Sequence, residues 1–289
     1  MNRQVKTLAE GIYFGEGPRW RNGRLWFSDF NAHAVKSVSL AGDLRTEFEI
    51  DDQPSGLGWL PDGTLLVVSM IKRQVLRRGA DGKFSVHADL SNIATFHCND
   101  MVVASDGRAF VGNFGFDLGA AMAKGLPDVL APHQTAKLAS IAPDGTVRVA
   151  SADMHFPNGS VITPDGRTLI VAETFARRLT AFDIGADGTL TNRRVWASTG
   201  ARLPDGICLN AKGAVWIANP GAPECVLIAP GGDVLDVIDT EHPCYACMLG
   251  GEDGRTLFML TAPPLGADAT APMGKLRIVS VDVPHAGLP

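Results

Sequence analysis

Residues 22–29 read NGRLWFSD, a turn dipeptide followed by a strand-like apolar run. The same arrangement recurs farther along the chain as DGTLLVVS (62–69), DGRAFVGN (106–113), DGRTLIVAE (165–173), KGAVWIAN (212–219) and DGRTLFMLT (253–261). The turn glycines of successive copies are 40–59 residues apart. Asn-Gly and Asp-Gly between apolar runs are strong hairpin signals, because a type I′ turn requires positive φ at both central residues. A repeat of this period predicts six similar β units.

A second turn follows the first one in each of the first five copies, at Ala41-Gly42, Asp81-Gly82, Asp144-Gly145, Asp187-Gly188 and Gly231-Gly232. Each unit therefore reads as one four-stranded propeller blade. The sixth copy ends on a single strand-like run, 275–283, and we expect the N-terminal segment around 4–10 to supply its missing outer strand. The sequence thus predicts an all-β, six-bladed β-propeller with four-stranded antiparallel blades, closed by an N-terminal strand in the last blade. Residues 1–289 would form one domain.

Composition restricts the class of partner and the compartment. A chain of 289 residues that is 45% hydrophobic can bury a large core. Its net charge of −5 argues against nucleic acid as a partner. The first 18 residues show neither the apolar h-region nor the small-residue cleavage site typical of a signal peptide, and no run of roughly 18 apolar residues that could span a membrane follows. We expect a cytoplasmic protein without membrane contact, a monomer or small homo-oligomer, whose five cysteines are buried structural thiols.

One connection between strands is unusually long. In a four-stranded blade both tight turns lie on one face of the ring, here called the turn face. The innermost strands begin on the opposite face, here called the front face, which also carries the middle connection of each blade. In the third blade this connection contains the Gly-, Ala- and Pro-rich residues 115–135. We interpret residues 115–135 as a lid-like insertion over the front face, and a tolerated surface insertion is the alternative.

Polar residues recur where the innermost strands begin, seven or eight residues before each first-turn glycine. The six residues at this position are Glu16, Ser55, Asn99, Asn158, Asp205 and Ala246. Carboxylates directed into a narrow channel would repel each other unless a cation neutralised them. Carboxylate and carboxamide oxygens together suit Ca²⁺, Mg²⁺ or Mn²⁺. The alternative is that these residues are ordinary turn formers.

Four stretches around these residues resemble the SMP-30/gluconolactonase/luciferin-regenerating-enzyme family of regucalcin-like lactonases. They are FGEGPRW (14–20), CND (98–100), PNG (157–159) and LPDG (203–206). The resemblance spans essentially the whole chain. It implies one divalent cation bound by Glu16, Asn158 and Asp205, with Ca²⁺ expected and Mg²⁺, Mn²⁺ or Zn²⁺ as alternatives. It also implies that Asp205 is the general base and that Asn99 contacts the cation or the substrate. The family's sugar lactonases often have an arginine where this chain has His97, which puts a polar aldonolactone in doubt.

These residues together predict a metal-dependent hydrolase that opens a small lactone, sugar-type or a related cyclic ester. The metal would polarise the carbonyl and activate water, with Asp205 taking the proton. Since a carboxylate bound to a dication is a weaker base, Asp205 could instead position a hydroxide or attack directly. His97 and the lid would orient the ring, and Asp100 and His155 are candidates for supporting or rim positions. For both histidines the alternative is a role without ligand contact.

Two other functions remain as alternatives. One is a phosphotriesterase that resembles diisopropyl-fluorophosphatase, in which a phosphoryl oxygen would take the place of the lactone carbonyl. The other is a non-catalytic calcium-binding propeller, which would leave the paired carboxylates Glu16 and Asp205 without a chemical role.

Overall fold

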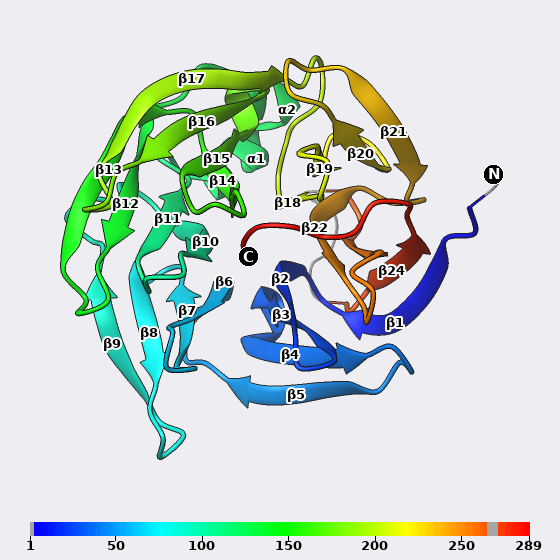
Figure 1. Ribbon diagram of the computed structural model, residues 1–289, viewed down its shortest axis with the longest axis horizontal. Helices are drawn as coiled ribbons and strands as arrows, with labels where there is room; N and C mark the ends of the chain where they lie inside the picture. The colour runs from blue at the N-terminus through cyan, green and yellow to red at the C-terminus, as the bar shows by residue number, and fades with distance from the viewer. Residues whose placement is uncertain (1–2, 265–270) are drawn as a thin grey trace.

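The computed structural model describes residues 3–264 and 271–289, and within these residues six four-stranded antiparallel sheets are set like blades around a central axis (Figure 1). The first three blades, from the innermost strand outward, are β2 (Gly15–Arg21), β3 (Arg24–Asp29), β4 (Ala34–Ser39) and β5 (Leu44–Glu49); β6 (Pro54–Trp59), β7 (Leu65–Ser69), β8 (Gln74–Arg78) and β9 (Phe84–Asp89); and β10 (Cys98–Val103), β11 (Ala109–Asn113), β12 (Ala136–Ile141) and β13 (Val147–Met154).

The remaining three blades follow the same plan. They are β14 (Pro157–Ile162), β15 (Thr168–Glu173), β16 (Arg178–Ile184) and β17 (Leu190–Ser198); β18 (Ile207–Leu209), β19 (Val215–Asn219), β20 (Glu224–Ile228) and β21 (Val234–Asp239); and β22 (Cys244–Gly250), β23 (Thr256–Thr261), β24 (Gly274–Ser280) and β1 (Lys6–Ile12). The six-bladed propeller predicted from the glycine repeat is confirmed.

The N-terminal strand closes the ring. β1 is the outermost strand of the last blade and pairs antiparallel with β24, where Lys6 lies opposite Ile278. Between the last blade and the first, Trp20 of β2 stacks on Phe258 of β23 with ring centroids 5.3 Å apart. Both ends of the chain are therefore tied into one blade, as predicted.

The first turns are of two kinds. Asn22 and Gly23 have φ values of 51° and 75°, as a type I′ turn requires. In the Asp-Gly copies only the glycine has a positive φ, as at Gly63 (φ 86°). There the aspartate closes the turn with its own side chain, since Asp62 Oδ1 accepts a 2.8 Å hydrogen bond from the backbone N–H of Thr64. The type I′ expectation is therefore wrong for the Asp-Gly turns, because aspartate favours a side-chain-closed turn that leaves positive φ to the glycine.

The C-terminal tail, residues 284–289, crosses the turn face and ends near the axis (Figure 1). Leu288 and Ile162 exchange two backbone hydrogen bonds, of 2.7 and 2.8 Å. The carbonyl of Pro284 accepts a 2.8 Å bond from the backbone N–H of Ala211, and a further bond reaches the first turn of the sixth blade. The tail thus covers the innermost turns of blades four to six, which the sequence did not predict.

The insertion in the third blade contains two short helices, α1 (Leu118–Lys124) and α2 (Leu126–Leu130). The Asp117 side chain caps α1 by accepting a 2.8 Å hydrogen bond from the N–H of Ala120. Gly125, with φ of 111°, separates the two helices. Each helix is too short to produce a visible helical period, which is why the sequence predicts only a loop there. Single 3₁₀ turns occur at η1 (Phe30–Ala32) and η2 (Thr174–Ala176).

All five cysteines are buried thiols, as interpreted from the sequence. The Sγ atoms of Cys208 and Cys247 are 3.9 Å apart. Burial raises the pKa of Cys98 to about 12. In residues 3–264 and 271–289, no helix has both the length and the apolar character needed to traverse a bilayer.

Candidate functional site

The predicted site residues lie at β-bulges of the innermost strands. In β2 the register shifts by one residue directly after Glu16. Asn99 in β10 and Asn158 in β14 lie inside equivalent shifts. A bulge lifts residues out of the regular ladder and re-aims their side chains. The bulges therefore give three blades polar side chains at the start of the innermost strand, beside the axis.

Asp205 comes just before β18 and is brought close to the fourth blade. Its carbonyl accepts a 3.2 Å hydrogen bond from the backbone N–H of Gly159, which follows Asn158. A Cβ atom at Gly159 would lie only 2.5 Å from the carbonyl oxygen of Asp205. The glycine at this position thus allows the two innermost strands to approach and places Asn158 beside Asp205.

Glu16, Asn99, Asn158 and Asp205 together form the floor of one cavity on the front face, with a volume of about 440 Å³. Ser55, the corresponding residue of the second blade, also lines it, whereas Ala246 does not. Asn99, Asn158 and Asp205 are buried, with 5–7% of their surface exposed, and Glu16 is half-buried. The structure thus brings four polar side chains from four blades to one cavity.

Burial and mutual repulsion act on the floor carboxyl groups. Burial, and next the charge of Asp205, raise the pKa of Glu16 well above its usual value. Burial, and next the charge of Asp100, likewise raise the pKa of Asp205, while a hydrogen bond from Asn158 opposes that rise. Two carboxylates held together in a buried pocket repel each other, so their ionised forms are disfavoured until positive charge is added.

Asn99 has no hydrogen-bond partner in the structure at either its Oδ1 or its Nδ2 atom, although both atoms are buried. Asn158, by contrast, is held in place, because its Nδ2 donates to Thr174 Oγ1 at 3.2 Å and that hydroxyl donates to the Pro204 carbonyl at 2.8 Å. A buried amide that lacks partners costs free energy unless a ligand satisfies it. Asn99 is therefore poised for a group that enters the cavity.

The donor set at the floor has the chemistry of a site for an oxygen-preferring divalent cation. It combines two carboxylates, which disfavour each other's charge, with two carboxamides, one of them unsatisfied. In the described part of the chain no cluster of three or more His, Cys, Asp and Glu side chains is arranged to hold a metal. The residues thus fit a Ca²⁺-like ion bound through mixed carboxylate and amide oxygens, and not an imidazole or thiolate site.

Asp100 is not among the residues that line the cavity. It is buried, and burial raises its pKa while the nearby Arg19 charge opposes that rise. The Arg19 guanidinium is itself buried and donates to the carbonyls of Leu57, at 2.9 Å, and Pro18, at 2.7 Å. Asp100 is therefore a buried carboxyl group close to the positive charge of Arg19, and a supporting role for it stays a prediction.

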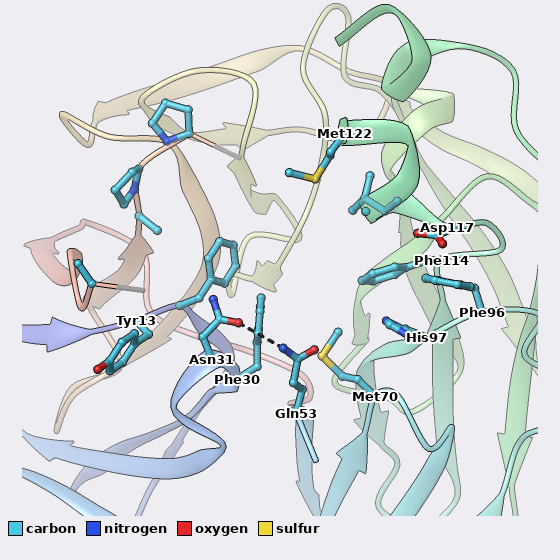
Figure 2. Close-up of a pocket in the computed structure, with 17 residues that line it drawn as sticks. Tyr13, Phe30, Asn31, Gln53, Met70, Phe96, His97, Phe114, Asp117 and Met122 are labelled. Atoms are coloured by element: carbon cyan, nitrogen blue, oxygen red, sulfur yellow. Dashed lines mark hydrogen bonds between the residues drawn. The ribbon is translucent and has the colours of Figure 1, made fainter. Parts of the chain in front are cut away.

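His97 lines a second, outer cavity of about 360 Å³ that adjoins the first one (Figure 2). The two cavities share wall residues, among them Phe30 and Phe114. The His97 ring stacks on Phe96 with centroids 4.2 Å apart, and burial lowers the pKa of His97. The imidazole is therefore part of the outer wall and does not reach the floor.

His155 does not line either described cavity. Its side chain is exposed, and its backbone N–H donates a 2.8 Å hydrogen bond to the carboxylate of Glu173. A rim role for His155 stays a prediction that gains no support from this position.

The walls follow two further repeated positions, of whose residues sequence reasoning singled out only His97. The residues directly after the second strand of each blade all line a cavity, and they are Phe30, Met70, Phe114, Thr174, Pro220 and Ala262. The residues two positions before the floor position do so in five blades, as Phe14, Gln53, His97, Phe156 and Leu203. The same register that located the floor would have located both sets.

Comparison with known proteins identifies relatives of this chain. The model of the family described as "SMP-30/Gluconolactonase/LRE-like region" matches residues 14–263. Regucalcin of Danio rerio is 29% identical over 280 residues, 92% of this chain and 88% of that protein. Gluconolactonase of Zymomonas mobilis is 24% identical over 289 residues, 88% of this chain and 78% of that protein.

Solved structures of low sequence identity share the fold. A luciferin-regenerating enzyme superposes with a TM-score of 0.83 at 17% identity, covering 99% of each chain. A calcium-binding regucalcin from Agrobacterium tumefaciens superposes with a TM-score of 0.81 at 21% identity, covering 99% of this chain and 97% of that one. Since the family model covers most of the chain, including every floor residue, the chain belongs to the SMP-30/gluconolactonase/LRE-like family.

Proposed function

We propose that this protein is a divalent-cation-dependent lactonase in which Glu16, Asn158 and Asp205 hold the cation. The observation that carries the proposal is the pair of carboxyl groups at the floor of a cavity, half-buried Glu16 and buried Asp205, whose pKa values are both raised. The unsatisfied amide of Asn99 beside them supports it, as do the relatives named gluconolactonase.

A bound divalent cation would supply positive charge that polarises an ester carbonyl and makes nearby water more acidic. Asp205 takes the proton from the attacking water, either as a base or by positioning the water, and direct attack by its carboxylate is the third role to be tested. Asn99 offers its free amide to the substrate or to the cation. The hydrogen bonds from Asn158 to Thr174 and onward to the Pro204 carbonyl keep the floor in one geometry.

Ca²⁺ is the expected ion, since the donors are carboxylate and amide oxygens, and a relative of the same fold is described as calcium-binding. Mg²⁺, Mn²⁺ and Zn²⁺ are the competitors. Their relative effect on turnover after chelation decides the identity of the ion.

The decisive experiment measures hydrolysis of aldono-, alkyl- and aromatic lactones before and after chelation, with each of the four cations added back. We expect chelation to abolish turnover and one cation to restore it. Asp205→Asn and Asp205→Ala should be inactive, whereas the control Asp51→Asn, whose side chain is fully exposed, should match the wild type. Turnover by either Asp205 variant at the wild-type rate would remove Asp205 from the chemistry.

Two outcomes would favour the other functions. Hydrolysis of an organophosphate triester with no lactone turnover would make the protein a phosphotriesterase. Cation binding detected by calorimetry without turnover of any ester would make it a calcium-binding propeller without catalysis.

A further inference from the structure

The walls of the inner cavity are largely apolar, and the two repeated wall positions account for this. Of the six residues that follow the second strands, Thr174 alone carries a polar side chain. At the other repeated position, Phe14, Phe156 and Leu203 line the inner cavity, while Gln53 and His97 lie in the outer one. A ligand that reaches the floor must therefore pass between apolar side chains from several blades.

Aromatic rings build two opposed parts of this wall. On one side Phe114 stacks on Phe156, with centroids 4.6 Å apart and an interplanar angle of 17°, and Phe175 meets Phe156 edge-on at 5.2 Å. On the other side the Phe14 ring lies 4.6 Å from Phe30 and 4.4 Å from Tyr245. Flat, rigid surfaces of this kind bind apolar or aromatic groups with little loss of conformational entropy.

The lid helices add an apolar roof, to which Leu118, Met122, Leu126, Val129 and Leu130 contribute. Leu126 is 67% exposed and Leu130 41% exposed, although both line the cavity. Large aliphatic side chains left in water beside a pocket gain free energy when a ligand covers them. A ligand that fills the cavity as far as this roof would cover exposed apolar surface.

Apart from the cation proposed at the floor, the cavities offer no positive charge to an anionic substituent. No lysine or arginine is found among the described residues that line either one. The charged residues there are Glu16 and Asp205 at the floor and Asp117, which is engaged in capping α1. The outer polar pair is also engaged, since Gln53 Nε2 donates to Asn31 Oδ1 at 3.3 Å (Figure 2). A phosphate, sulfonate or carboxylate substituent would lose its hydration without a partner.

We propose that the substrate is an uncharged lactone bearing an aryl or alkyl substituent, with the ring at the floor and the substituent between the Phe114–Phe156 stack and the roof at Leu126 and Leu130. This inference rests on the proposed lactonase function. The cavity volume of about 440 Å³ accommodates a small lactone ring together with such a substituent.

The test compares δ-valerolactone, a series of δ-alkyl-δ-lactones of rising chain length, dihydrocoumarin, glucono-δ-lactone and 6-phosphogluconolactone. We expect kcat/KM to rise about fourfold for each methylene until the cavity is full, as burial of one CH₂ allows. Dihydrocoumarin should exceed glucono-δ-lactone, and the phosphorylated lactone should be the poorest substrate. A flat or falling alkyl series, or glucono-δ-lactone as the best substrate, would overturn the inference while leaving the lactonase function intact.

Leu126→Gln supplies the matched variant, since Leu126 is exposed and its replacement does not disturb a packed core. The ratio of kcat/KM for the longest alkyl lactone to that for δ-valerolactone should fall about fivefold to tenfold. The control is Leu235→Gln in β21, the outermost strand of the fifth blade. Leu235 is 57% exposed, which is similar to Leu126, and it lies outside both cavities. That variant should keep the wild-type ratio, and an equal fall in both variants would contradict the assignment of the roof.

A binding measurement separates this inference from the proposed function. The same alkyl series is prepared as δ-lactams, which resist hydrolysis, and binding is followed by thermal shift and calorimetry. If no lactone is turned over, the lactonase proposal fails. The inference about the cavity still stands if lactam affinity rises with chain length. It is refuted if the affinity does not rise.

Discussion

Replacing Asp205 by asparagine should stabilise the cation-free protein while abolishing its activity. Asp205 is 7% exposed, and burial followed by the charge of Asp100 raises its pKa. Asparagine has nearly the same shape and keeps a side-chain oxygen for the hydrogen bond from Asn158, so the change removes charge without opening a cavity. Burial of an inadequately partnered polar group costs about 1–3 kcal/mol, and more when the group is charged, so we expect removal of the charge to return roughly 1–3 kcal/mol. For a chain of this size such a gain raises Tm by roughly 2–6 °C.

Addition of the cation should reverse this order. A ligand that binds only the folded state stabilises it by about 2.7 kcal/mol at one hundred times its Kd. The wild type gains this free energy, and the Asp205→Asn variant, which lacks one carboxylate ligand, gains little of it. The wild type should therefore be the less stable protein in chelator and the more stable one in saturating cation.

Urea unfolding at pH 7, with chelator and with cation, measures both differences. Asp51→Asn serves as the control, because the Asp51 side chain is fully exposed and its removal should leave both curves unchanged. The reasoning would be refuted if Asp205→Asn were less stable than the wild type in chelator. It would equally be refuted if cation stabilised both proteins to the same extent.

Three further predictions concern pH, the tail and a packed glycine. Burial raises the pKa of both floor carboxyl groups, so their contribution to the stability of the cation-free fold is fully present below about pH 4 and is lost as pH rises toward their folded pKa values. The double variant Glu16→Gln/Asp205→Asn should lack this decline when urea unfolding is measured as a function of pH. Deleting residues 284–289 removes several backbone hydrogen bonds and should lower the free energy of unfolding by about 2–5 kcal/mol, and an unchanged urea midpoint would contradict this. In Gly112→Ala the new Cβ would lie 2.1 Å from the carbonyl oxygen of Pro157 and 2.7 Å from Asn99 Oδ1. We expect the free energy of unfolding to fall by about 1–3 kcal/mol and kcat to be reduced. Wild-type values for both quantities would contradict this expectation.

The features that sequence predicted are those set by short-range chemistry or by the repeat. Turn glycines such as Gly23 and Gly63 fix hairpins locally, so the number of blades follows from counting them. Once the blades are aligned, the position of Glu16 defines the equivalent residues in the other blades. The floor of the cavity was therefore predictable from a single chain.

The features that were missed depend on contacts between distant segments or on elements too short for a pattern. Residues 284–289 carry no strand signal of their own, and their partners, such as Ile162, are far away in the sequence, so the contacts of the tail could not be predicted. The helices α1 and α2 span fewer than two full turns, so the insertion was predicted as a loop. The register alone would have placed Phe114 and Phe156 beside the cavity, but the stacking of their rings between blades three and four is not encoded by any local pattern.

The C-terminal tail covers part of the face opposite the cavity. Residues 284–289 lie over the turns of blades four to six, on the face opposite the cavity. We therefore expect small molecules to enter and leave the cavity through the front face. The carboxyl terminus is consequently a natural point of attachment. A protein immobilised on a support through a linker after Pro289 would face the surrounding solution with its cavity, and its turnover should not depend on how densely the support is loaded.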